Sequence, residues 1–498
     1  MYPVSVGEKG GAVTLEALLT FFGILIAILA IARPVQRASL KLFLRVWQWV
    51  LVGAILLSVA LIVCRDAPLG WRPLFGLSFS AAIFDLSLGA FAAPVLAAWC
   101  CWKAWDRAKL TRNRAGLVES VFKVALRERE FDEVERIVRK NLGRLTQLPV
   151  SATTVLFDPA IVAALVDSHS LVHLELLANM EFLNSLENRF GAVDVVVRQL
   201  LRSGVSPLRS AVVNRYGGLE QLAYSDSERE LIEKTFQNPT WYFEASAHYP
   251  LVILAIETLR SGKLDANYNE VGRGYEATQG VSERAYCCIY LAVKTEVLAI
   301  EAALEGRSEN DFYVSDLFQI FDAVLERSRF TKAVWESPLS NPEFPTPYAY
   351  LLYEITADFR ALSAAAIRVA TSHTFPSQAQ EPGRVAQDLA QNWSFCIWRI
   401  ADSEDRVSLP FRNDVTEEYL KFVLALHGQP SEVYAGSVSS TVEGLRAWRD
   451  LFLHELKSRF GSSRTGEKTA LREAFDSLDQ GKRYISEGSA WLEEELFG

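Results

Sequence analysis

Two acidic side chains stand inside long apolar runs near the N-terminus. Glu16 is the only charged residue in Val13–Ala32, Asp85 is the only one in Leu74–Trp102, and Arg65 follows the apolar run between them. A carboxylate inside a membrane segment is a functional candidate, because burying its charge there is costly. Two interpretations remain open. Arg65 pairs with the carboxylates in an interfacial cluster, or the carboxylates form an acidic ring at the outer mouth of an oligomeric pore or a proton-responsive site.

His169 and His173 are the candidate metal ligands. They stand four residues apart, one turn of a helix, so both could bind one zinc ion from a single helix face. Two ligands do not make a zinc site, and the sequence places no third. We therefore interpret them as a solvated or capping pair, and we predict no metal and no other cofactor.

Other motifs with chemistry are incomplete. Residues 461–469 approach a phosphate-binding loop, but Glu467 separates the second glycine from Lys468, and no strand precedes the loop. The six cysteines lack the C-x-x-C spacing of zinc and redox sites, and Cys396 is expected in the core. The many carboxylates of the chain read as solvated helix faces. We predict no catalytic residue.

Three apolar runs within residues 1–114 have the length of membrane-spanning helices. A helix needs about 20 apolar residues to cross the hydrocarbon core, and its backbone polar groups must be satisfied within the segment. The predicted spans are residues 13–32, 46–64 and 80–102. Cleavage of the first run as a signal peptide is the alternative, but the basic flank follows that run instead of preceding it.

Basic residues around the spans predict an orientation. The loop between the first two spans carries four of them, whereas the next loop carries only Arg65 and Arg72. The positive-inside rule then places the N-terminus outside and everything after Trp102 in the cytoplasm, in a multi-pass protein of the inner (plasma) membrane. Five basic residues that follow the third span are expected to lie against anionic lipid headgroups: Lys103, Arg107, Lys109, Arg112 and Arg114.

Small residues recur at four-residue steps in the first and third spans. They share one helix face and allow close approach of helix backbones, which predicts a packing seam and a homo-oligomer. The seam residues are Gly23, Ala27, Gly89, Ala93 and Ala97.

Charge divides the chain near Arg114. Residues 1–114 hold 12 Lys and Arg against 5 Asp and Glu, whereas the remainder has a net charge of −16. An acidic body repels phosphate backbones, so nucleic acid is not an expected partner.

Helical periodicity dominates from Ala115 onward, with apolar residues at three- and four-residue spacing. Val150–Phe157 is the best strand candidate, and Asp132 with Glu135 suggests a capping box. Predicted helices include Ile161–Met180, Val193–Arg202, Ser227–Gln237, Pro250–Arg260, Ser282–Glu305, Ser315–Arg329, Tyr348–Thr371, Val385–Asp402, Glu417–His427, Thr441–Phe460 and Lys468–Leu496.

The predicted fold class is therefore mostly α. A three-helix transmembrane region precedes a large cytoplasmic all-α region, built as an irregular helical bundle or a solenoid-like array. A Pro-rich loop at 337–347 is expected to separate helical subdomains at 115–336 and 348–498.

These observations favour a membrane-anchored interaction, sensor or scaffold protein. Its partners would be the lipid bilayer, further copies of itself, and a cytoplasmic protein or small-molecule signal. One alternative is a membrane effector whose oligomerised transmembrane bundle conducts ions or permeabilises the membrane, which Glu16 and Asp85 suggest. The other alternative is an enzyme whose site is assembled from scattered helical residues.

Overall fold

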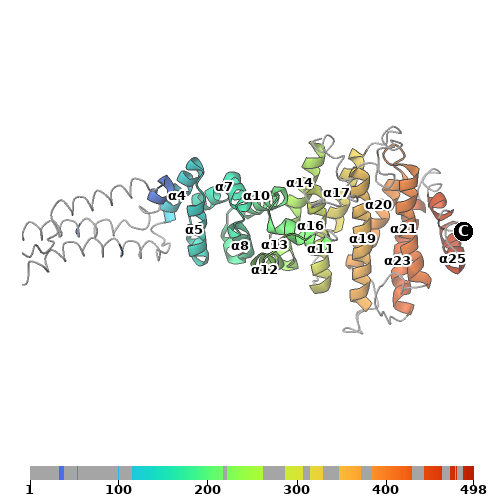
Figure 1. Ribbon diagram of the computed structural model, residues 1–498. Helices are drawn as coiled ribbons and strands as arrows, with labels where there is room; N and C mark the ends of the chain where they lie inside the picture. The colour runs from blue at the N-terminus through green and yellow to red at the C-terminus, as the bar shows by residue number, and fades with distance from the viewer. Residues whose placement is uncertain are drawn as a thin grey trace, which may run out of the picture. The chain divides into compact units, whose positions relative to one another are not determined.

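The computed structural model describes most of the chain from Ala115 onward and little before it. The described residues are 33–38, 53, 99, 115–216, 221–261, 287–306, 314–328, 347–371, 384–428, 442–461, 471–476, 478 and 486–497. Over these ranges the regular structure is helical, with no strand, so the predicted all-α class is confirmed for this part of the chain (Figure 1).

Apart from Gly53 and Trp99, the three predicted spans lie outside the described residues, and they stay a prediction. Within the described ranges, no single helix has the length and apolar character needed to cross a membrane. One pair of helices, Val150–Leu156 and Pro159–Asp167, meets the requirement of length and composition, with a bend of 48° between them.

Contacts divide the chain into two compact units. The first comprises Met1–Leu165 with Ser185–Glu187, and the second comprises Val166–Asn184 with Asn188–Gly498.

In the first unit, short helices pack around a small apolar core. Its elements are α4 (Ala115–Glu128), α5 (Asp132–Asn141), the 3-10 helix η3 (Leu142–Gln147), α6 (Val150–Leu156) and most of α7 (Pro159–Asp167). Helix α4 packs against α5 and α6. The predicted apolar faces of α4 and α5 are largely buried, as periodicity requires, through Val118, Val121, Phe122, Ala125, Val134, Ile137 and Val138.

The predicted strand at Val150–Phe157 is wrong, because these residues form α6. Pro149 precedes the helix with φ −68°, and Ala152 and Leu156 bury one face at a four-residue spacing. The hydroxyls of Thr153 and Thr154 both donate to the carbonyl oxygen of Val150, at 2.8 and 2.9 Å. Packing of that face therefore overrides the strand preference of the β-branched residues.

The capping box predicted at Asp132 and Glu135 is also wrong. Helix α5 begins at Asp132 itself, and the residue before it, Phe131, makes no side-chain cap. A capping box occurs instead at Ser225 and Glu228, where each side chain meets the backbone N–H of the other.

The second unit is an array of helices that ends with α25. Its helices are α8 (Val172–Ala178), α9 (Met180–Ser185), α10 (Arg189–Arg202), α11 (Pro207–Tyr216), α12 (Asp226–Lys234), α13 (Pro239–Glu244), α14 (His248–Arg260), α16 (Cys288–Gly306), α17 (Val314–Arg327), α19 (Pro347–Thr371), α20 (Arg384–Ala401), α21 (Leu409–Gly428), α23 (Val442–Gly461) and α25 (Ser486–Phe497).

Several predicted helices are confirmed, among them α10, α14, α17, α19, α20 and α23. The residues predicted as the Pro-rich loop lie outside the described ranges except Pro347, which begins α19. Helices from both sides of that loop pack together in this unit, since α17 contacts α19 and α20, and α16 contacts α19.

Helix α16 is buried on nearly every side. It packs against α10, α11, α13, α14, α17 and α19. Its apolar residues from Ile289 to Ala303 are almost fully covered, except the half-buried Ala302. A helix enclosed in this way is expected to be apolar all round. Three consecutive polar residues in its middle, Lys294, Thr295 and Glu296, are the exception.

Candidate functional site

Lys294, Thr295 and Glu296 are the buried polar residues of α16, with exposed fractions of 4%, 0% and 1%. Successive residues of a helix point about 100° apart, so each faces a different neighbour. Thr295 donates its hydroxyl to the carbonyl oxygen of Leu291 within α16 at 2.7 Å. Lys294 and Glu296 are therefore the two buried charged groups of this helix, and they lie on opposite sides of it.

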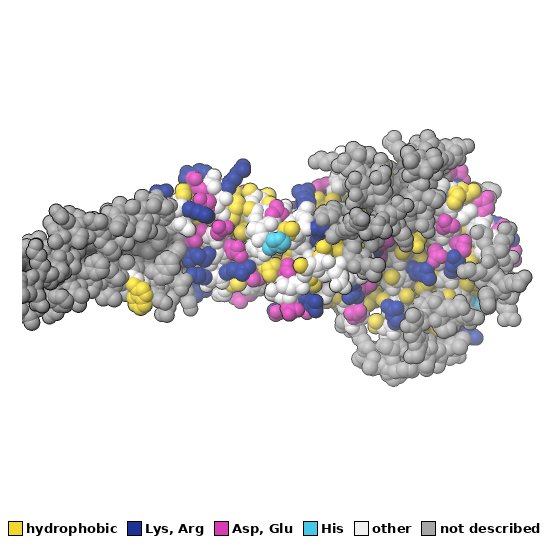
Figure 2. Space-filling view, in the orientation of Figure 1, with side chains coloured by type: hydrophobic (Ala, Val, Ile, Leu, Met, Phe, Trp, Pro, Cys, Tyr) yellow, Lys and Arg dark blue, Asp and Glu magenta, His cyan; other side chains and the backbone are white. Residues whose placement is uncertain are grey.

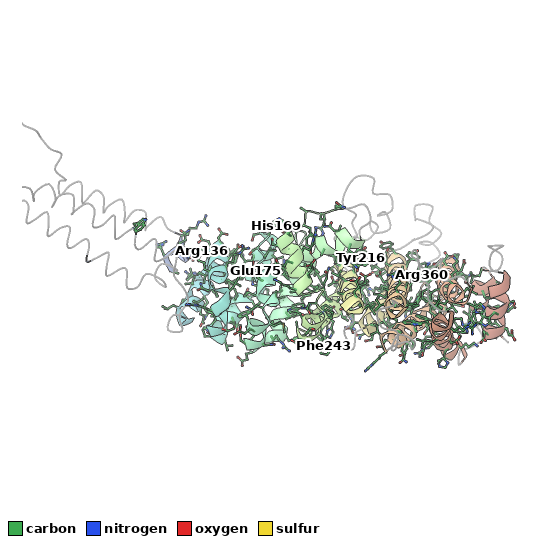
Figure 3. The ribbon with its side chains drawn as sticks, turned by 90° about the horizontal axis from the view of Figure 1, so that it is seen from below. Arg136, His169, Glu175, Tyr216, Phe243 and Arg360 are labelled. Atoms are coloured by element: carbon green, nitrogen blue, oxygen red, sulfur yellow. The ribbon has the colours of Figure 1, made fainter. Side chains whose placement is uncertain are left out.

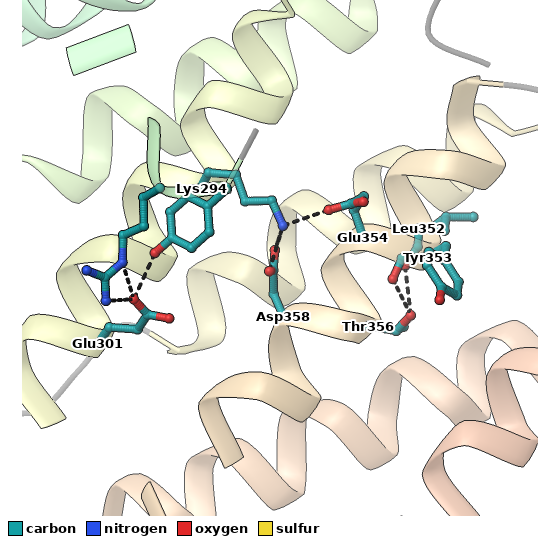
Figure 4. A network of polar contacts seen from close by, with 9 residues as sticks. Lys294, Glu301, Leu352, Tyr353, Glu354, Thr356 and Asp358 are labelled. Carbon is teal, nitrogen blue, oxygen red and sulfur yellow. Dashed lines mark hydrogen bonds and ion pairs between the residues drawn. The ribbon is translucent and has the colours of Figure 1, made fainter. Parts of the chain in front are cut away.

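Lys294 is held by two carboxylates of α19 (Figure 4). Its Nζ lies 2.6 and 2.8 Å from the two carboxylate oxygens of Asp358, and 2.7 Å from Oε2 of Glu354. Glu354 and Asp358 are four residues apart, so both reach the ammonium group from one helix face. The rings of Tyr216 and Tyr290 lie 5.5 and 5.4 Å from Nζ, within range of a cation–π interaction.

This environment keeps Lys294 protonated. Burial disfavours its charge, but the attraction of Asp358 and Glu354 outweighs burial and raises the pKa of Lys294 overall. Burial raises the pKa of Asp358 to about 6, although the charge of Lys294 acts against that rise. A lysine held as a cation is neither a nucleophile nor a general base, so the cluster binds helices together instead of performing chemistry.

A second ion pair extends the network to α11. The hydroxyl of Tyr216 donates to Oε2 of Glu301 at 2.9 Å, and Nε of Arg215 donates to the same oxygen at 2.9 Å. Because the Tyr216 ring also faces Lys294, one connected polar network joins α11, α16 and α19.

The opposite face of α19 borders a small cavity. Its volume is about 30 Å³, room for only one or two water-sized groups. Four residues of α19, one of α20 and two of α21 line it: Tyr353, Thr356, Ala357, Arg360, Trp393, Val415 and Glu418. An ion pair between Arg360 and Glu418 joins α19 to α21 at this cavity. Figure 3 labels Arg360.

Trp393 lines the cavity and also carries a buried hydrogen-bond donor. Its indole is 1% exposed and packs edge-on against Tyr419, Phe422 and Phe452, with ring centroids 4.6, 5.1 and 5.9 Å away. Its Nε1–H meets no acceptor among the described residues. Buried indole N–H groups usually find an acceptor, so this unsatisfied donor is an exception among the described residues.

Most of the site residues predicted from the sequence lie outside the described ranges. These are the membrane candidates Glu16, Asp85 and Arg65, the seam residues Gly23, Ala27, Gly89, Ala93 and Ala97, and the basic residues Lys103, Arg107, Lys109, Arg112 and Arg114.

His169 and His173 do not share a helix, contrary to the predicted helix Ile161–Met180. That helix breaks after Asp167, and His169 adopts a left-handed conformation with φ 60° in an exposed turn (Figure 3). His173 lies in α8 and is 1% exposed. The described residues contain no group of three or more His, Cys, Asp and Glu able to hold a metal ion.

Cys396 lies in the core, as expected, and burial raises the pKa of its thiol well above the usual value. A buried thiol kept protonated is a packing group and not a nucleophile. The expectation that carboxylates lie on solvated faces is wrong for Glu296, Asp316 and Asp358, which are all buried.

Sequence reasoning missed the Lys294 network and the cavity. One usable signal was present: Lys294 and Glu296 interrupt an otherwise apolar stretch of helix, where a charge is not expected on a solvated face. No family model, curated protein or solved structure matches this chain.

Proposed function

We propose that this chain is a membrane-anchored helical sensor or scaffold whose cytoplasmic body binds a small signal or a protein partner. Residues 1–114 would form the anchor, and their three long apolar runs and net charge of +7 support this role. The cavity between α19, α20 and α21 would be the binding site, and it is the observation that carries the proposal.

The polar groups at the cavity indicate the kind of ligand group that fits. Arg360 offers a guanidinium that Glu418 already neutralises, and the Trp393 ring forms an apolar part of the wall. A carboxylate would compete with Glu418 for Arg360. A volume of about 30 Å³ admits only such a compact group, with the rest of the ligand outside.

Mixed surface charge agrees with a binding role other than nucleic-acid recognition. On the face shown in Figure 2, basic and acidic side chains alternate over the described parts. A nucleic-acid footprint needs a clustered basic surface.

The binding half of the proposal is tested with the full chain in mild detergent. Acetate, succinate and N-acetylglycine are titrated, with acetamide as the neutral comparison, and the unfolding temperature is followed. We expect a saturable rise with at least one of the acids and a smaller one with acetamide. No rise with any of the acids contradicts the assignment of the cavity.

Two variants localise the binding. Ala357→Leu fills the cavity, whereas Ala361→Leu adds the same volume one turn further along α19, where the residue is exposed. Ala361→Leu should keep the acid-dependent rise, and Ala357→Leu should lose it. An equal rise in both variants would place the bound acid elsewhere.

The membrane half is tested by topology. A fluorescent protein fused after Gly498 should be active, and an alkaline phosphatase fused at the same place should be inactive, if the body is cytoplasmic. The opposite result, or a full chain that stays soluble without detergent, refutes the anchor.

Self-association is tested at the small-residue seam. Gly89→Ile with Ala93→Ile should shift the protein in detergent toward smaller assemblies, because bulky residues separate the helix backbones. Phe91→Ile lies on the opposite face of the same predicted helix and should leave the assembly size unchanged. If both variants form assemblies of the same size, the predicted packing seam is wrong.

A further inference from the structure

Glu296 and Asp316 are buried carboxyl groups on adjacent helices. Glu296 lies in the middle of α16 and Asp316 in the first turn of α17, with exposed fractions of 1% and 6%. Helices α16 and α17 pack against each other. A carboxylate is rarely buried to this extent unless a cation or several hydrogen-bond donors compensate its charge.

Compensation is largely missing here. Among the described residues no ion pair reaches either carboxyl group, and the contact to Asp316 is a hydrogen bond of 3.1 Å from the side-chain amide of Gln319. Oε1 of Glu296, Oδ2 of Asp316 and the hydroxyl of Tyr242 are all buried without a hydrogen-bond partner in the described part. These oxygen atoms thus lack a hydrogen bond of good geometry, and the neighbour that interacts with Glu296 is the uncharged phenol of Tyr242.

Within the described ranges, the neighbouring helices place no cation in an ion pair with Glu296 or Asp316. Helix α13 contributes Tyr242, whose phenol acts on Glu296, and α14 contributes His248, whose ring centroid lies 6.4 Å from that of Tyr242. Several charged side chains of the described neighbours form ion pairs, and they form them with residues other than Glu296 and Asp316. These pairs are Lys294 with Glu354 and Asp358, Arg215 with Glu301, Arg198 with Asp194 and Glu257, and Arg399 with Asp322.

Burial of both carboxyl groups favours a protonated pair near neutral pH. Burial raises the pKa of Asp316 to about 7. Burial first, and then the charge of Asp316, raise the pKa of Glu296 well above its usual value. Two carboxyl groups that interact in this way do not both ionise easily, because the second charge is repelled by the first.

We propose that Glu296 and Asp316 form a proton-operated switch in the packing of α17 against α16. With protons on the pair, the acids are neutral and the core is closed. Raising the pH releases a proton to solvent and leaves a buried negative charge that no described residue balances in an ion pair. The first turn of α17 then moves away from α16 so that Asp316 reaches water, whereas Glu296, in the middle of α16, stays in place.

Asp316 is the group that moves because of its position in its helix. It stands at the beginning of α17, where few helix hydrogen bonds must be broken to displace it. Glu296 is eight residues from the start of a 19-residue helix that six other helices cover. Opening at α17 therefore costs less than opening at α16.

Hydrogen exchange of the full chain in detergent tests the switch. Exchange of peptides from α17 is compared at pH 6 and pH 8 after correction for the intrinsic rate. We expect at least a several-fold faster corrected exchange at pH 8 in the wild type and no such change in Asp316→Asn. Equal pH dependence in the two proteins overturns the proposal.

A matched control separates the pair from carboxylates in general. Asp322→Asn removes a carboxylate of the same helix that is paired with Arg399, with Nε to Oδ1 2.8 Å. This variant should keep the pH-dependent exchange. If it abolishes the pH dependence as Asp316→Asn does, the effect belongs to the helix and not to the pair.

Infrared spectroscopy of the wild type gives a measurement that does not depend on how well any variant folds. The wild type should show the C=O stretching band of a protonated carboxyl group at pH 6, and part of that band should disappear through pH 7. Glu296→Gln should reduce the band at pH 6. If the wild type lacks this band at pH 6, the carboxyl pair is not protonated and the proposal is wrong.

Discussion

The imidazole ring of His427 stacks on the indole ring of Trp491, with centroids 4.0 Å apart and planes 9° from parallel. The guanidinium of Arg449 lies 4.7 Å from the indole centroid, and its Nη1 is 2.9 Å from Nδ1 of His427. Three helices meet in this stack, because His427 belongs to α21, Arg449 to α23 and Trp491 to α25. It therefore fastens the last described helix to the body.

Trp491→Ala should release α25. Ring stacking is worth about 0.5–1.5 kcal/mol and an exposed cation–π contact about 0.5–1 kcal/mol, so we expect a loss of about 2 kcal/mol in the free energy of unfolding. Denaturant unfolding measures the loss, and hydrogen exchange should show it first in α25. Glu494→Ala, an exposed position of the same helix, should cost little. A Trp491→Ala protein with unchanged exchange in α25 would mean that other contacts hold the helix.

Lys294→Met should destabilise the protein by about 3–5 kcal/mol, because it leaves two buried carboxylates without their cation. The loss should be greater at pH 8 than at pH 5. Asp358 already has a raised pKa of about 6, and without the lysine it should take up a proton even more readily. At pH 5 the folded variant then holds a neutral acid, whereas at pH 8 it must bury a charge or pay to protonate it.

The double variant Lys294→Met with Asp358→Leu tests that reasoning by removing both charges. Replacing a buried ion pair by apolar groups is often nearly neutral, so the double variant should be more stable than Lys294→Met alone. If the double variant loses as much stability as Lys294→Met and Asp358→Leu lose together, coupling between Lys294 and Asp358 is absent. Thermal and denaturant unfolding at both pH values provide the comparison.

Two buried tryptophans offer a measurement of one hydrogen bond. Nε1 of Trp241 donates to the carbonyl oxygen of Leu177 at 2.6 Å, near the end of α8, whereas Nε1 of Trp393 has no acceptor in the described part. Trp→Phe shrinks the side chain equally at both sites. We expect Trp241→Phe to cost about 1–2 kcal/mol more than Trp393→Phe in denaturant unfolding, since only there is a carbonyl left unsatisfied. Equal costs would show that the Leu177 carbonyl finds another donor.

The helices of the body were predictable because their apolar residues recur at the helical period and are buried accordingly. Helices α14, α17 and α20 start and end within about two residues of the predicted bounds, an error typical of helix ends. Helix α6 was missed because four of its seven residues are β-branched, and a short window cannot show that Ala152 and Leu156 pack on one face.

The candidate site was not predictable to the same degree, because its partners are distant in the chain. Lys294 and Asp358 are 64 residues apart, and periodicity reveals which face of a helix is buried but not what it meets. The cavity likewise needs three helices, α19, α20 and α21, to exist. The charged residues inside the apolar stretch of α16 are a signal that the sequence analysis did not use, and only tertiary packing decides that Lys294 is paired and Glu296 is not.

His248 should make the protein less stable in acid. Burial lowers its pKa to about 4, from an ordinary value of about 6.5. Between these pH values the imidazole is protonated in the unfolded chain but neutral in the folded chain. The free energy of unfolding therefore falls as the pH falls through this window. The full shift corresponds to about 3 kcal/mol, and partial contact of the ring with solvent reduces this to about 1–2 kcal/mol.

His248→Gln should remove this acid-dependent loss between pH 6.5 and 4, and His454→Gln, at an exposed position of α23, should retain it. Asp316 acts in the opposite direction, because its raised pKa adds stability as the pH falls from about 7 toward 4. We therefore compare His248→Gln with its parent in both the wild-type and the Asp316→Asn backgrounds, by urea unfolding at each pH. If the free energy of unfolding still falls with pH after His248→Gln in both backgrounds, other groups cause the acid sensitivity. If this pH dependence is lost in both backgrounds, the fold requires the neutral imidazole of His248.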